Sequence, residues 1–524
     1  MSAINRTESF DLAFRFITET NLNVYLTGKA GTGKTTFLRY LRDVSHKNIV
    51  VAAPTGVAAI NAGGVTLHSL FQLPFAPFIP GNTPQENTLT GHPLLSQIRF
   101  NTQKRKILIN MDLLVIDEIS MVAANTLDSI DIILKSIRRN YEQPFGGVQV
   151  LFIGDLHQLP PVVKRDHIDL FRSVYKSVYF FDSHVLSMYP PVMVELKKVF
   201  RQSDDVFVDI LNGIRDNELT QKHLGLLNER LDPSFTPSDN DGYITLTTHN
   251  SQADDINAKK INNIKGKEYI FSAEIKDDFP PHMYPADVDL QLKLGAQVMF
   301  LKNDTEDKQY FNGKIGTVVE LGRDEIIVQC KDDHGTITVS KDVWENIHYK
   351  VDPVSREIEE EKLGSFKQYP LRLAWGITIH KSQGLTFDKL IVDAQKAFTN
   401  GQVYVALSRV TSLGGLVLTS PIGKQFLGAS QNLKNWESVH NNEEVLPQKL
   451  EDSRIECIRQ ELLQVFDWHI PVQEIIKLKT AVVDMKDNLS PDCEPWIIEI
   501  TENILASNKV AKDFQSNVFR ITSS

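Results

Sequence analysis

Short apolar runs alternate along the first part of the chain with segments whose apolar residues recur at helical spacing. The apolar runs are long enough for buried strands, at 22–27, Ile49–Ala53, Leu113–Ile116 and Val148–Ile153. The segment Thr35–Asp43 places Phe37, Leu38 and Leu41 on one helical face. This repeated order of strand and then helix predicts an α/β fold in which helices cover a parallel sheet.

A second series of the same kind begins at Tyr243–Thr248 and resumes from Leu371 to about Gln425. The intervening stretch 304–369 instead holds short β-type runs separated by Gly and Asp, at Ile315–Leu321, Glu325–Cys330, Thr336–Val339 and Ile347–Val351. Several short strands at this spacing predict a small β-barrel of the SH3-like kind, inserted in the second α/β region.

Two further stretches depart from the alternation. Residues Gln72–Gln103 are rich in Pro, Gly, Thr and Asn and have no clean period, so we expect an inserted subdomain or a long functional loop outside the core, over 72–105. No glycine follows Gly428, and apolar residues recur there at helical spacing. This last pattern predicts a helical appendage over 431–524.

Composition limits the class of protein. The chain has 524 residues, of which 42% are hydrophobic and 23% charged, as in an ordinary globular enzyme with more than one core. No apolar run is long enough for a membrane span, and the cysteines Cys330, Cys457 and Cys493 form no CxxC pair. We therefore expect no membrane partner, no disulfide framework, no zinc site and a reducing cytoplasm. The net charge of −10 argues against a broadly basic nucleic-acid binder but is compatible with a local positive groove.

The strongest chemical signal is Gly28-x4-Gly33-Lys34-Thr35, between a predicted strand and a predicted helix. Glycines let consecutive N–H groups surround phosphate oxygens, and the helix N-terminus adds partial positive charge. Lys34 is expected to reach the β- and γ-phosphates of ATP, and the Thr35 hydroxyl to bind Mg²⁺. The residues predicted to hold the nucleotide here are Gly28, Ala30, Gly31, Thr32, Gly33, Lys34, Thr35 and Thr36.

Two other strand ends carry polar side chains that suit ATP hydrolysis. Asp117 and Glu118 follow the run Leu113–Ile116. Asp117 is expected to hold Mg²⁺ through water, and Glu118 to polarise the attacking water. Gln158 follows the run that ends at Ile153 and is a candidate sensor of the γ-phosphate, although this segment by itself would indicate a solvated turn.

Together with further segments, these residues resemble the Pif-type (petite integration frequency) DNA helicases of superfamily one, relatives of the RecD helicases. The resemblance covers roughly Asn21 to Phe426. Its most specific part is Asp128–Gln149, which is similar to the signature that distinguishes Pif helicases from other members. It implies two RecA-like motor domains, the first at 1–190 and the second at 191–303 with 370–430, and a β-barrel insert at 304–369.

The resemblance also implies roles for residues outside the glycine loop. Arg201 and Arg409 are expected to bring positive charge to the transferring phosphoryl group when the motor domains close, and Gln383 and Gly384 to lie at the nucleotide. For three of the expected DNA contacts, His68, Phe71 and His380, packing in the core is as compatible with the sequence as base stacking. The expected contacts with single-stranded DNA are Pro54, Thr55, Gly56, Thr66, His68, Ser69, Phe71, Thr378, His380, Lys381 and Ser382.

The implied protein is a monomeric 5′→3′ DNA helicase of a bacterial-type cytoplasm that uses ATP and Mg²⁺. It would translocate on single-stranded DNA and unwind duplex at single-strand/duplex junctions, with 72–105 as the wedge. Two alternatives stay open: an ATP-switched DNA-binding clamp that remodels a partner without unwinding, and a RecD-like subunit of a larger complex. The stretch Glu8–Ala13 lacks the glutamine with which the family reads adenine, so the base selectivity stays open.

Overall fold

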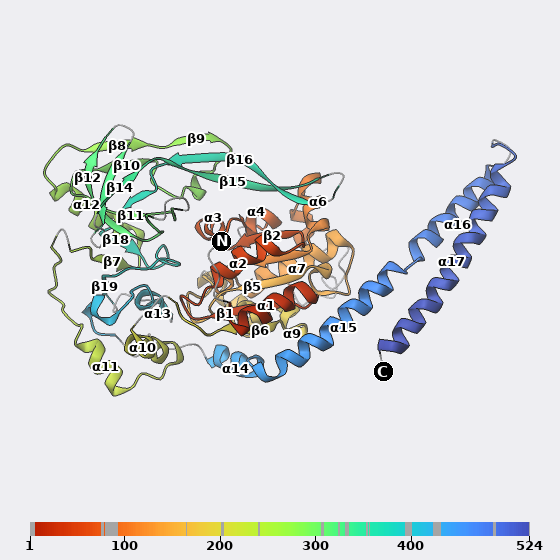
Figure 1. Ribbon diagram of the computed structural model, residues 1–524, viewed down its shortest axis with the longest axis horizontal. Helices are drawn as coiled ribbons and strands as arrows, with labels where there is room; N and C mark the ends of the chain where they lie inside the picture. Colours follow the sequence, from red (N-terminus) through yellow and green to blue (C-terminus); the bar gives the residue numbers. More distant parts are fainter. Residues whose placement is uncertain are drawn as a thin grey trace. The chain divides into compact units, whose positions relative to one another are not determined.

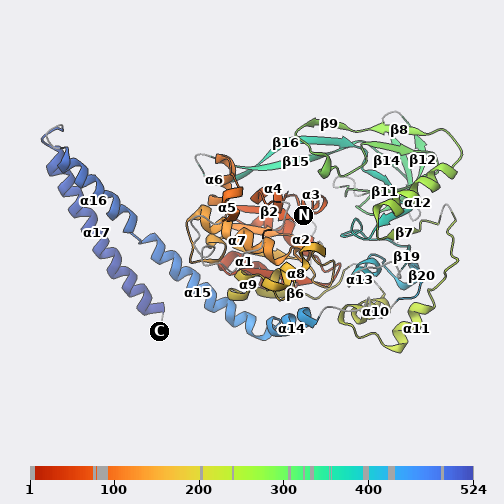
Figure 2. The same cartoon turned by 180° about the vertical axis from the view of Figure 1, so that it is seen from behind.

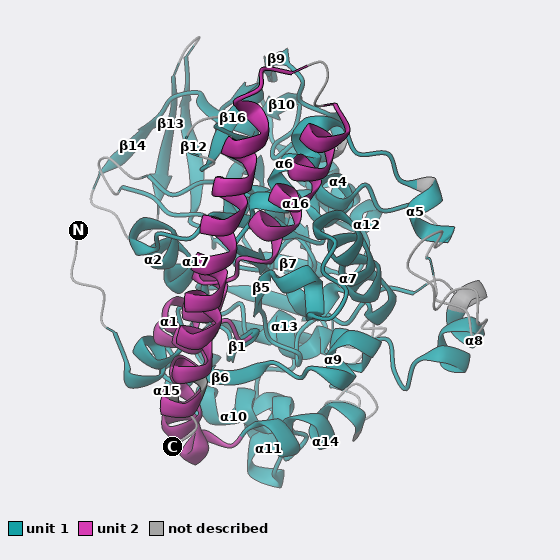
Figure 3. Ribbon diagram, turned by 90° about the vertical axis from the view of Figure 1, so that its right-hand side faces the viewer, with its two compact units in different colours: residues 1–13, 23–441 teal, residues 14–22, 442–524 magenta. Residues whose placement is uncertain are grey.

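The computed structural model describes residues 6–74, 78, 93–163, 165–200, 204–238, 241–304, 309–322, 325–330, 335–352, 355, 357–393, 401–422, 431–485 and 489–522. They form two compact units, residues 1–13 with 23–441 and residues 14–22 with 442–524, which Figure 3 shows in different colours. Within the described parts of the chain, no helix combines the length and the apolar character that crossing a membrane requires.

A six-stranded parallel sheet, in the order β3-β2-β4-β5-β1-β6, lies in the part of the larger unit where the resemblance implies the first motor domain, and this part is called the first motor region below. Its strands are β1 Val24–Gly28, β2 Ile49–Ala53, β3 Val65–Thr66, β4 Leu113–Ile116, β5 Gln149–Ile153 and β6 Val192–Leu196. The helices of this part of the chain are α1 Glu8–Glu19, α2 Lys34–Val44, α3 Gly56–Ala62, α4 Leu67–Phe71, α5 Pro93–Gln97, α6 Thr102–Asn110, α7 Ala124–Arg138, α8 Arg165–Val174 and α9 His184–Met188.

Strand β6 lies beyond the predicted end of the first domain at 190 but belongs to this first sheet. It pairs with β1 from Val24 opposite Val192 to Gly28 opposite Leu196. A Cβ atom at Gly28 would lie 2.6 Å from the carbonyl oxygen of Leu196, and Gly28 has a positive φ of +150°. Glycine at this position therefore allows the two strands to run side by side up to the glycine loop.

A second parallel sheet, in the order β18-β7-β19-β20, forms the second motor region and is assembled from distant parts of the chain. Its strands are β7 Ile244–Thr247, β18 Gly376–Thr378, β19 Leu390–Asp393 and β20 Leu416–Ser420, and the helices of this region are α10 Asp205–Asp216, α11 Gln221–Asn228, α12 Asn250–Asn263 and α13 Gln402–Leu407. Apolar side chains of α10 and α13, such as Phe207 and Val405, pack in one core with this sheet. The two parallel sheets agree with the predicted α/β class.

Antiparallel sheets are inserted in the chain between β7 and β18. Five strands form one sheet in the order β14-β13-β12-β11-β17, three form the sheet β15-β16-β9, and β10 pairs with β8. The strands are β8 Tyr269–Ser272, β9 Glu274–Asp277, β10 Asp289–Leu292, β11 Gln297–Phe300, β12 Ile315–Leu321, β13 Ile326–Cys330, β14 Thr336–Val339, β15 Asp342–Val351, β16 Ile358–Gln368 and β17 Leu371–Leu373.

These strands extend beyond the insert that the sequence predicts at 304–369. Three of its four expected runs correspond to β12, β13 and β14, whereas Ile347–Val351 is the end of β15, in a different sheet. Strands β11 and β17 lie outside 304–369 in sequence, yet they pair with each other, and β11 also pairs with β12. The sheet is therefore completed by residues that the β-type runs alone did not indicate.

The hairpin of β15 and β16 extends from the antiparallel sheets to α6 in the first motor region (Figures 1 and 2). The hydroxyl of Tyr349, which is 3% exposed, accepts a hydrogen bond at 3.3 Å from the backbone N–H of Val51 in β2. Arg42 of α2 forms an ion pair with Glu360 of β16. Tyr349 thus belongs to the core of the first sheet, although it lies 298 positions after Val51.

Part of the predicted subdomain at 72–105 also belongs to the first core. Leu73, Leu94 and Ile98 are buried there, because their apolar side chains pack with those of α6 and α7. The expectation that this whole stretch lies outside the core is therefore wrong at both of its ends. Residues 75–77 and 79–92, which contain most of the predicted wedge, lie outside the described residues.

The smaller unit consists of helices α15 Leu446–Val465, α16 His469–Asp484 and α17 Cys493–Thr522 together with residues 14–22. Arg15 forms ion pairs with Glu19 at 3.0 Å and with Glu451 at 2.9 Å. The rings of Phe466 and Phe514 lie 4.2 Å apart. The long C-terminal helices are confirmed, but the first helix of the predicted appendage, α14 Gln431–His440, belongs to the larger unit.

Candidate functional site

The glycine loop lies between β1 and the N-terminus of α2. Gly31 and Gly33 have positive φ angles of +83° and +94°, which glycine adopts without steric cost. The Nζ atom of Lys34 donates hydrogen bonds to the carbonyl oxygens of Gly28 at 2.6 Å and Lys29 at 3.1 Å. The loop therefore holds its lysine at a helix N-terminus, where the orphan N–H groups and the helix dipole favour a phosphate.

A cavity of about 660 Å³ opens beside this loop and is lined by residues of both motor regions. The predicted site residues in its lining are Ala30, Gly31, Thr32, Gly33, Lys34, Thr35, Thr36, Glu118, Gln158, Gly384 and Arg409. Further lining residues come from separate segments of the chain that share no motif, so the sequence did not predict them. They are Thr7, Phe10, Leu196, Lys198, Phe200, Phe311 and Thr386. Phe200 and Phe311 are 51% and 49% exposed, so two phenylalanine side chains are left open to this cavity.

The acidic pair lies at the end of β4, close to the glycine loop. The Asp117 carboxylate accepts a hydrogen bond at 2.9 Å from the backbone N–H of Glu118, which has a left-handed φ of +52°. Burial, followed by the charge of Glu118, raises the pKa of Asp117 to about 7. Burial also raises the pKa of Glu118, against the opposing charges of Lys34 and Arg409. Both carboxyl groups therefore bind a proton more readily than they would in water.

Arg409 comes from the second motor region and is only 1% exposed, yet it lines the cavity. Its Nε donates to the carbonyl oxygen of Val405 at 2.9 Å, and its Nη2 donates to Ser408 Oγ at 3.1 Å. Gln383 does not line the cavity, and its amide nitrogen is buried. Arg201, the other predicted arginine, lies outside the described residues.

The predicted DNA contacts of the first motor region divide into exposed and buried residues. Thr55 and Thr66 are the N-caps of α3 and α4, and each side chain accepts a backbone hydrogen bond at 3.2 Å. Pro54, Thr55 and His68 line a cavity of about 370 Å³. Phe71 is 0% exposed in the first core, so the prediction that it stacks on bases is wrong.

The second motor region shows the same division. Thr378 and Lys381 line a cavity of about 260 Å³ together with Asn257 and Arg372. His380 is exposed, but Ser382 is 0% exposed and donates its hydroxyl proton to the carbonyl oxygen of Ile379 at 2.7 Å. Ser382 therefore holds the turn rather than contacting DNA, contrary to the prediction.

Partial burial lowers the pKa of both His68 and His380. A lowered pKa favours the neutral imidazole, which can offer a ring face without carrying a charge. Base stacking by His68 and His380 therefore stays a prediction.

The signature segment Asp128–Gln149 serves the fold of the first motor region. The buried Asp131 accepts a hydrogen bond from the backbone N–H of Phe145 at 2.6 Å and forms an ion pair with Lys135 at 2.7 Å. Arg138 donates to several backbone carbonyls near the ends of α6 and of the signature loop. These polar residues fix the turn after α7 and do not line the cavity beside the glycine loop.

The sequence and the structure are similar to those of known helicases. A profile of the family described as PIF1-like helicase matches residues 6–223. The human ATP-dependent DNA helicase PIF1 is 34% identical over 414 residues, which cover 75% of this chain and 58% of the human protein. This chain therefore spans less than two thirds of the length of the human relative. The ATP-dependent DNA helicase Pif1 of Bdellovibrio bacteriovorus is 31% identical over 405 residues, covering 76% of this chain and 84% of that protein.

Solved structures of Pif1 from Bacteroides sp are similar as well. In complex with ADP-AlF4, that protein gives a TM-score of 0.76 at 42% identity and covers 84% of this chain and 97% of its own. Bound to ssDNA, it gives a TM-score of 0.58 at 42% identity and covers 83% of this chain and 97% of its own.

Proposed function

Because the chain belongs to the PIF1-like helicase family, we propose that it is an ATP-dependent DNA helicase that translocates 5′→3′ on single-stranded DNA and unwinds duplex. The observation that carries this proposal is the cavity beside the glycine loop. It brings Lys34, Glu118 and Gln158 of the first motor region together with Arg409 of the second. A nucleotide in this cavity would touch both regions, so its hydrolysis would change how they interact.

The chemistry follows from charge. Phosphoryl transfer spreads negative charge over the γ-phosphate oxygens, and fixed cations stabilise that charge. Lys34 supplies one cation from the glycine loop, and Arg409 supplies a second from the opposite region. Glu118 would orient and polarise the attacking water, because its carboxylate lies in the same cavity. Arg201 remains a proposed third cation.

The residues present also fit a magnesium ion. The Thr35 hydroxyl and the Asp117 carboxylate would hold Mg²⁺ together with nucleotide phosphates. The raised pKa of Asp117, about 7, supports this proposal, because a carboxyl pair with this electrostatic cost is stabilised by an added cation. When bound, Mg²⁺ would offset charge on the β- and γ-phosphates.

Single-stranded DNA is proposed to lie across both motor regions. The Bacteroides sp relative bound to ssDNA supports this proposal. Pro54, Thr55 and His68 on one region, and Thr378 and Lys381 on the other, line two cavities of about 370 and 260 Å³. Hydroxyl groups, backbone N–H groups and one ammonium suit sugar–phosphate contacts that do not depend on sequence. The residues 72–105 would part the strands at the junction.

We propose that the helicase works as a monomer in a bacterial-type cytoplasm. An ATP-switched DNA-binding clamp is the second candidate, since the same cavity would switch the two regions without strand separation. A RecD-like subunit that needs a larger complex is the third.

The deciding experiment measures strand displacement with ATP and Mg²⁺ on duplexes that carry either a 5′ or a 3′ single-stranded tail. The proposal requires displacement of the 5′-tailed duplex alone. DNA-stimulated ATP hydrolysis without displacement would favour the clamp, and an inert chain would favour the subunit. Lys34→Ala should abolish ATP hydrolysis but leave binding of a fluorescent oligonucleotide within about twofold, because Lys34 reaches the phosphates rather than the DNA. Lys176→Ala, at an exposed position away from the cavity, is the matched control.

A further inference from the structure

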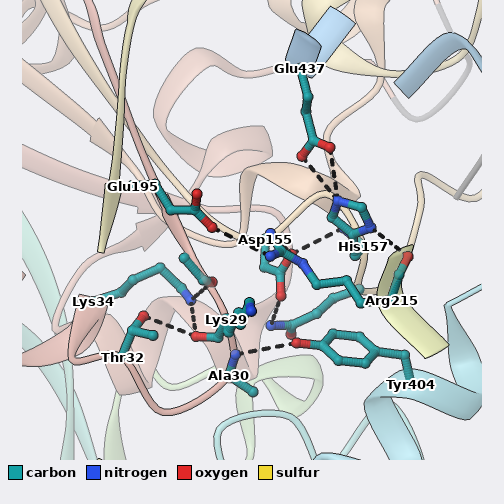
Figure 4. A network of polar contacts seen from close by, with 12 residues as sticks. Lys29, Ala30, Thr32, Lys34, Asp155, His157, Glu195, Arg215, Tyr404 and Glu437 are labelled. Atoms are coloured by element: carbon teal, nitrogen blue, oxygen red, sulfur yellow. Dashed lines mark hydrogen bonds and ion pairs between the residues drawn. The ribbon is translucent and has the colours of Figure 1, made fainter. Parts of the chain in front are cut away.

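A buried cluster of charged residues joins the two motor regions behind the glycine loop (Figure 4). At its centre is Arg215, near the end of α10, with 7% of its surface exposed. Neighbouring residues of α10, including Ile210 and Ile214, pack in the core of the second sheet. Arg215 therefore moves with the second motor region.

The partners of Arg215 belong to the first sheet. Its Nη1 lies 3.3 Å from Glu195 Oε1 in β6, and its Nη2 lies 3.7 Å from Asp155 Oδ1, just after β5. The carbonyl oxygen of Arg215 also lies 3.2 Å from His157 Nδ1. Burial alone would raise the pKa of Asp155, but the charge of Arg215 and of nearby groups lowers that pKa below its usual value. Arg215 thus keeps Asp155 ionised in a dry environment.

Asp155 in turn holds the candidate γ-phosphate sensor. Its Oδ2 accepts a hydrogen bond from Gln158 Nε2 at 3.2 Å, and its carbonyl oxygen accepts one from the backbone N–H of Gln158 at 2.9 Å. An ionised carboxylate can only accept, so it fixes which end of the Gln158 amide faces it. The second N–H of that amide and its oxygen remain available to the nucleotide cavity, which Gln158 lines.

We propose that Arg215 is a positioning residue for ATP hydrolysis, which orients the Gln158 amide through Asp155 and so makes that orientation depend on where the second motor region lies. This inference rests on the proposed function of the cavity. A second contact between the two motor regions supports the proposal: the hydroxyl of Tyr404 in α13 accepts a hydrogen bond from the backbone N–H of Ala30 at 3.5 Å. The second motor region thus touches the glycine loop as well as Asp155 and Glu195 of the first.

Open polar space lies beside the Arg215 side chain. A polar cavity of about 410 Å³ is lined by Arg215, Lys29, Glu195 and Asp216. Asp155 does not line this cavity, so the open space lies on the Glu195 side of the guanidinium. Movement of α10 away from β5 would weaken the Asp155 contact first, because at 3.7 Å it is already longer than the 3.3 Å contact with Glu195.

The test compares the steady-state kinetics of DNA-stimulated ATP hydrolysis by the full chain. Arg215→Gln should lower kcat about tenfold while KM for ATP and the Kd for fluorescent ADP stay within about twofold, since the phosphate loop itself is unchanged. Arg215→Lys, which keeps the charge, should recover part of kcat. Asp155→Asn should reproduce the loss, and the double variant should be no slower than Asp155→Asn, because both changes break one chain of contacts.

The control is Asp216→Asn, the neighbouring cavity residue, which should leave kcat unchanged. An unchanged kcat in Arg215→Gln, or losses that multiply in the double variant, would overturn the inference. If Arg215→Gln does not fold, Arg215→Lys in the wild-type and Asp155→Asn backgrounds supplies the same comparison. A wild-type chain without ATP hydrolysis would instead refute the proposed function, so the two failures are distinguishable.

Discussion

Asp128 offers a direct measure of how strongly the signature segment stabilises the first motor region. The side chain is 4% exposed and its carboxylate accepts hydrogen bonds from Tyr175 Oη at 2.9 Å and from the backbone N–H groups of His184 and Val185, both at 3.0 Å. Asp128→Ala removes the acceptor and leaves these donors in place. A buried donor without a partner costs about 1–3 kcal/mol.

The expected loss follows from how buried each donor is. Val185 and Tyr175 are buried and cannot recover a water partner, whereas His184 is exposed and can. The two buried donors that lose their acceptor destabilise Asp128→Ala, and the removal of a buried carboxylate offsets part of that cost. Together these effects should lower the free energy of unfolding by about 3 kcal/mol. Burial raises the pKa of Asp128, so the neutral Asp128→Asn, which retains one acceptor oxygen, should lose less.

The assay is urea unfolding followed by far-ultraviolet circular dichroism. Because the chain has more than one core, more than one transition is expected, and the change is measured in the transition that includes the first motor region. Tyr175→Phe serves as the matched variant: it removes one donor and should cost about 1 kcal/mol. In the Asp128→Ala background the same change should recover part of the loss, because it removes a buried hydroxyl that has already lost its acceptor. A loss below about 1 kcal/mol in Asp128→Ala, accompanied by failure to unwind DNA, would refute the structural role.

Three further predictions concern other buried polar groups. The pKa of Asp117 is raised to about 7 in the fold, so its contribution to stability is present in acid and is lost as pH rises through about 7. Asp117→Asn should therefore melt at a higher temperature than wild type at pH 8 in metal-free buffer, and the difference should be smaller at pH 5. A lower melting temperature of Asp117→Asn at pH 8 would contradict this. Tyr349→Phe should cost about 1 kcal/mol and accelerate hydrogen exchange at the Val51 amide, whose partner it removes; unchanged exchange would argue against that hydrogen bond. Arg138→Met should lower the free energy of unfolding by about 2–3 kcal/mol in urea, because several backbone carbonyls lose a charged donor, and an unchanged midpoint would contradict this.

The sequence predicted the elements whose conformation is determined by a few consecutive residues. Strand β4 begins and ends at the predicted residues because all four of its side chains are buried, which leaves an uninterrupted apolar run between polar neighbours. The glycine loop was equally visible, since its positive φ angles require glycine at Gly31 and Gly33. In both cases the constraint lies within a few consecutive residues, so the sequence carries it directly.

Long-range pairing could not be predicted in the same way. No local feature of Val192–Leu196 predicts that this strand joins the first sheet, because its place there depends on hydrogen bonding to β1, which is distant in sequence. The contacts of Arg215 with Asp155 and Glu195 link three elements, and no fixed spacing marks them. For Phe71 the sequence was compatible with both DNA stacking and core packing, and only the tertiary structure places it in the first core.

The hairpin of β15 and β16 has a consequence for how the protein is made. During synthesis the strands of the first sheet leave the ribosome well before Tyr349, which bonds to Val51 and completes that core. A nascent chain that ends near residue 300 would therefore expose an unpaired N–H in β2 and part of an apolar surface. The first motor region reaches its final stability only after the antiparallel sheets have been synthesised. A fragment that ends near residue 300 should accordingly aggregate more readily than the full chain.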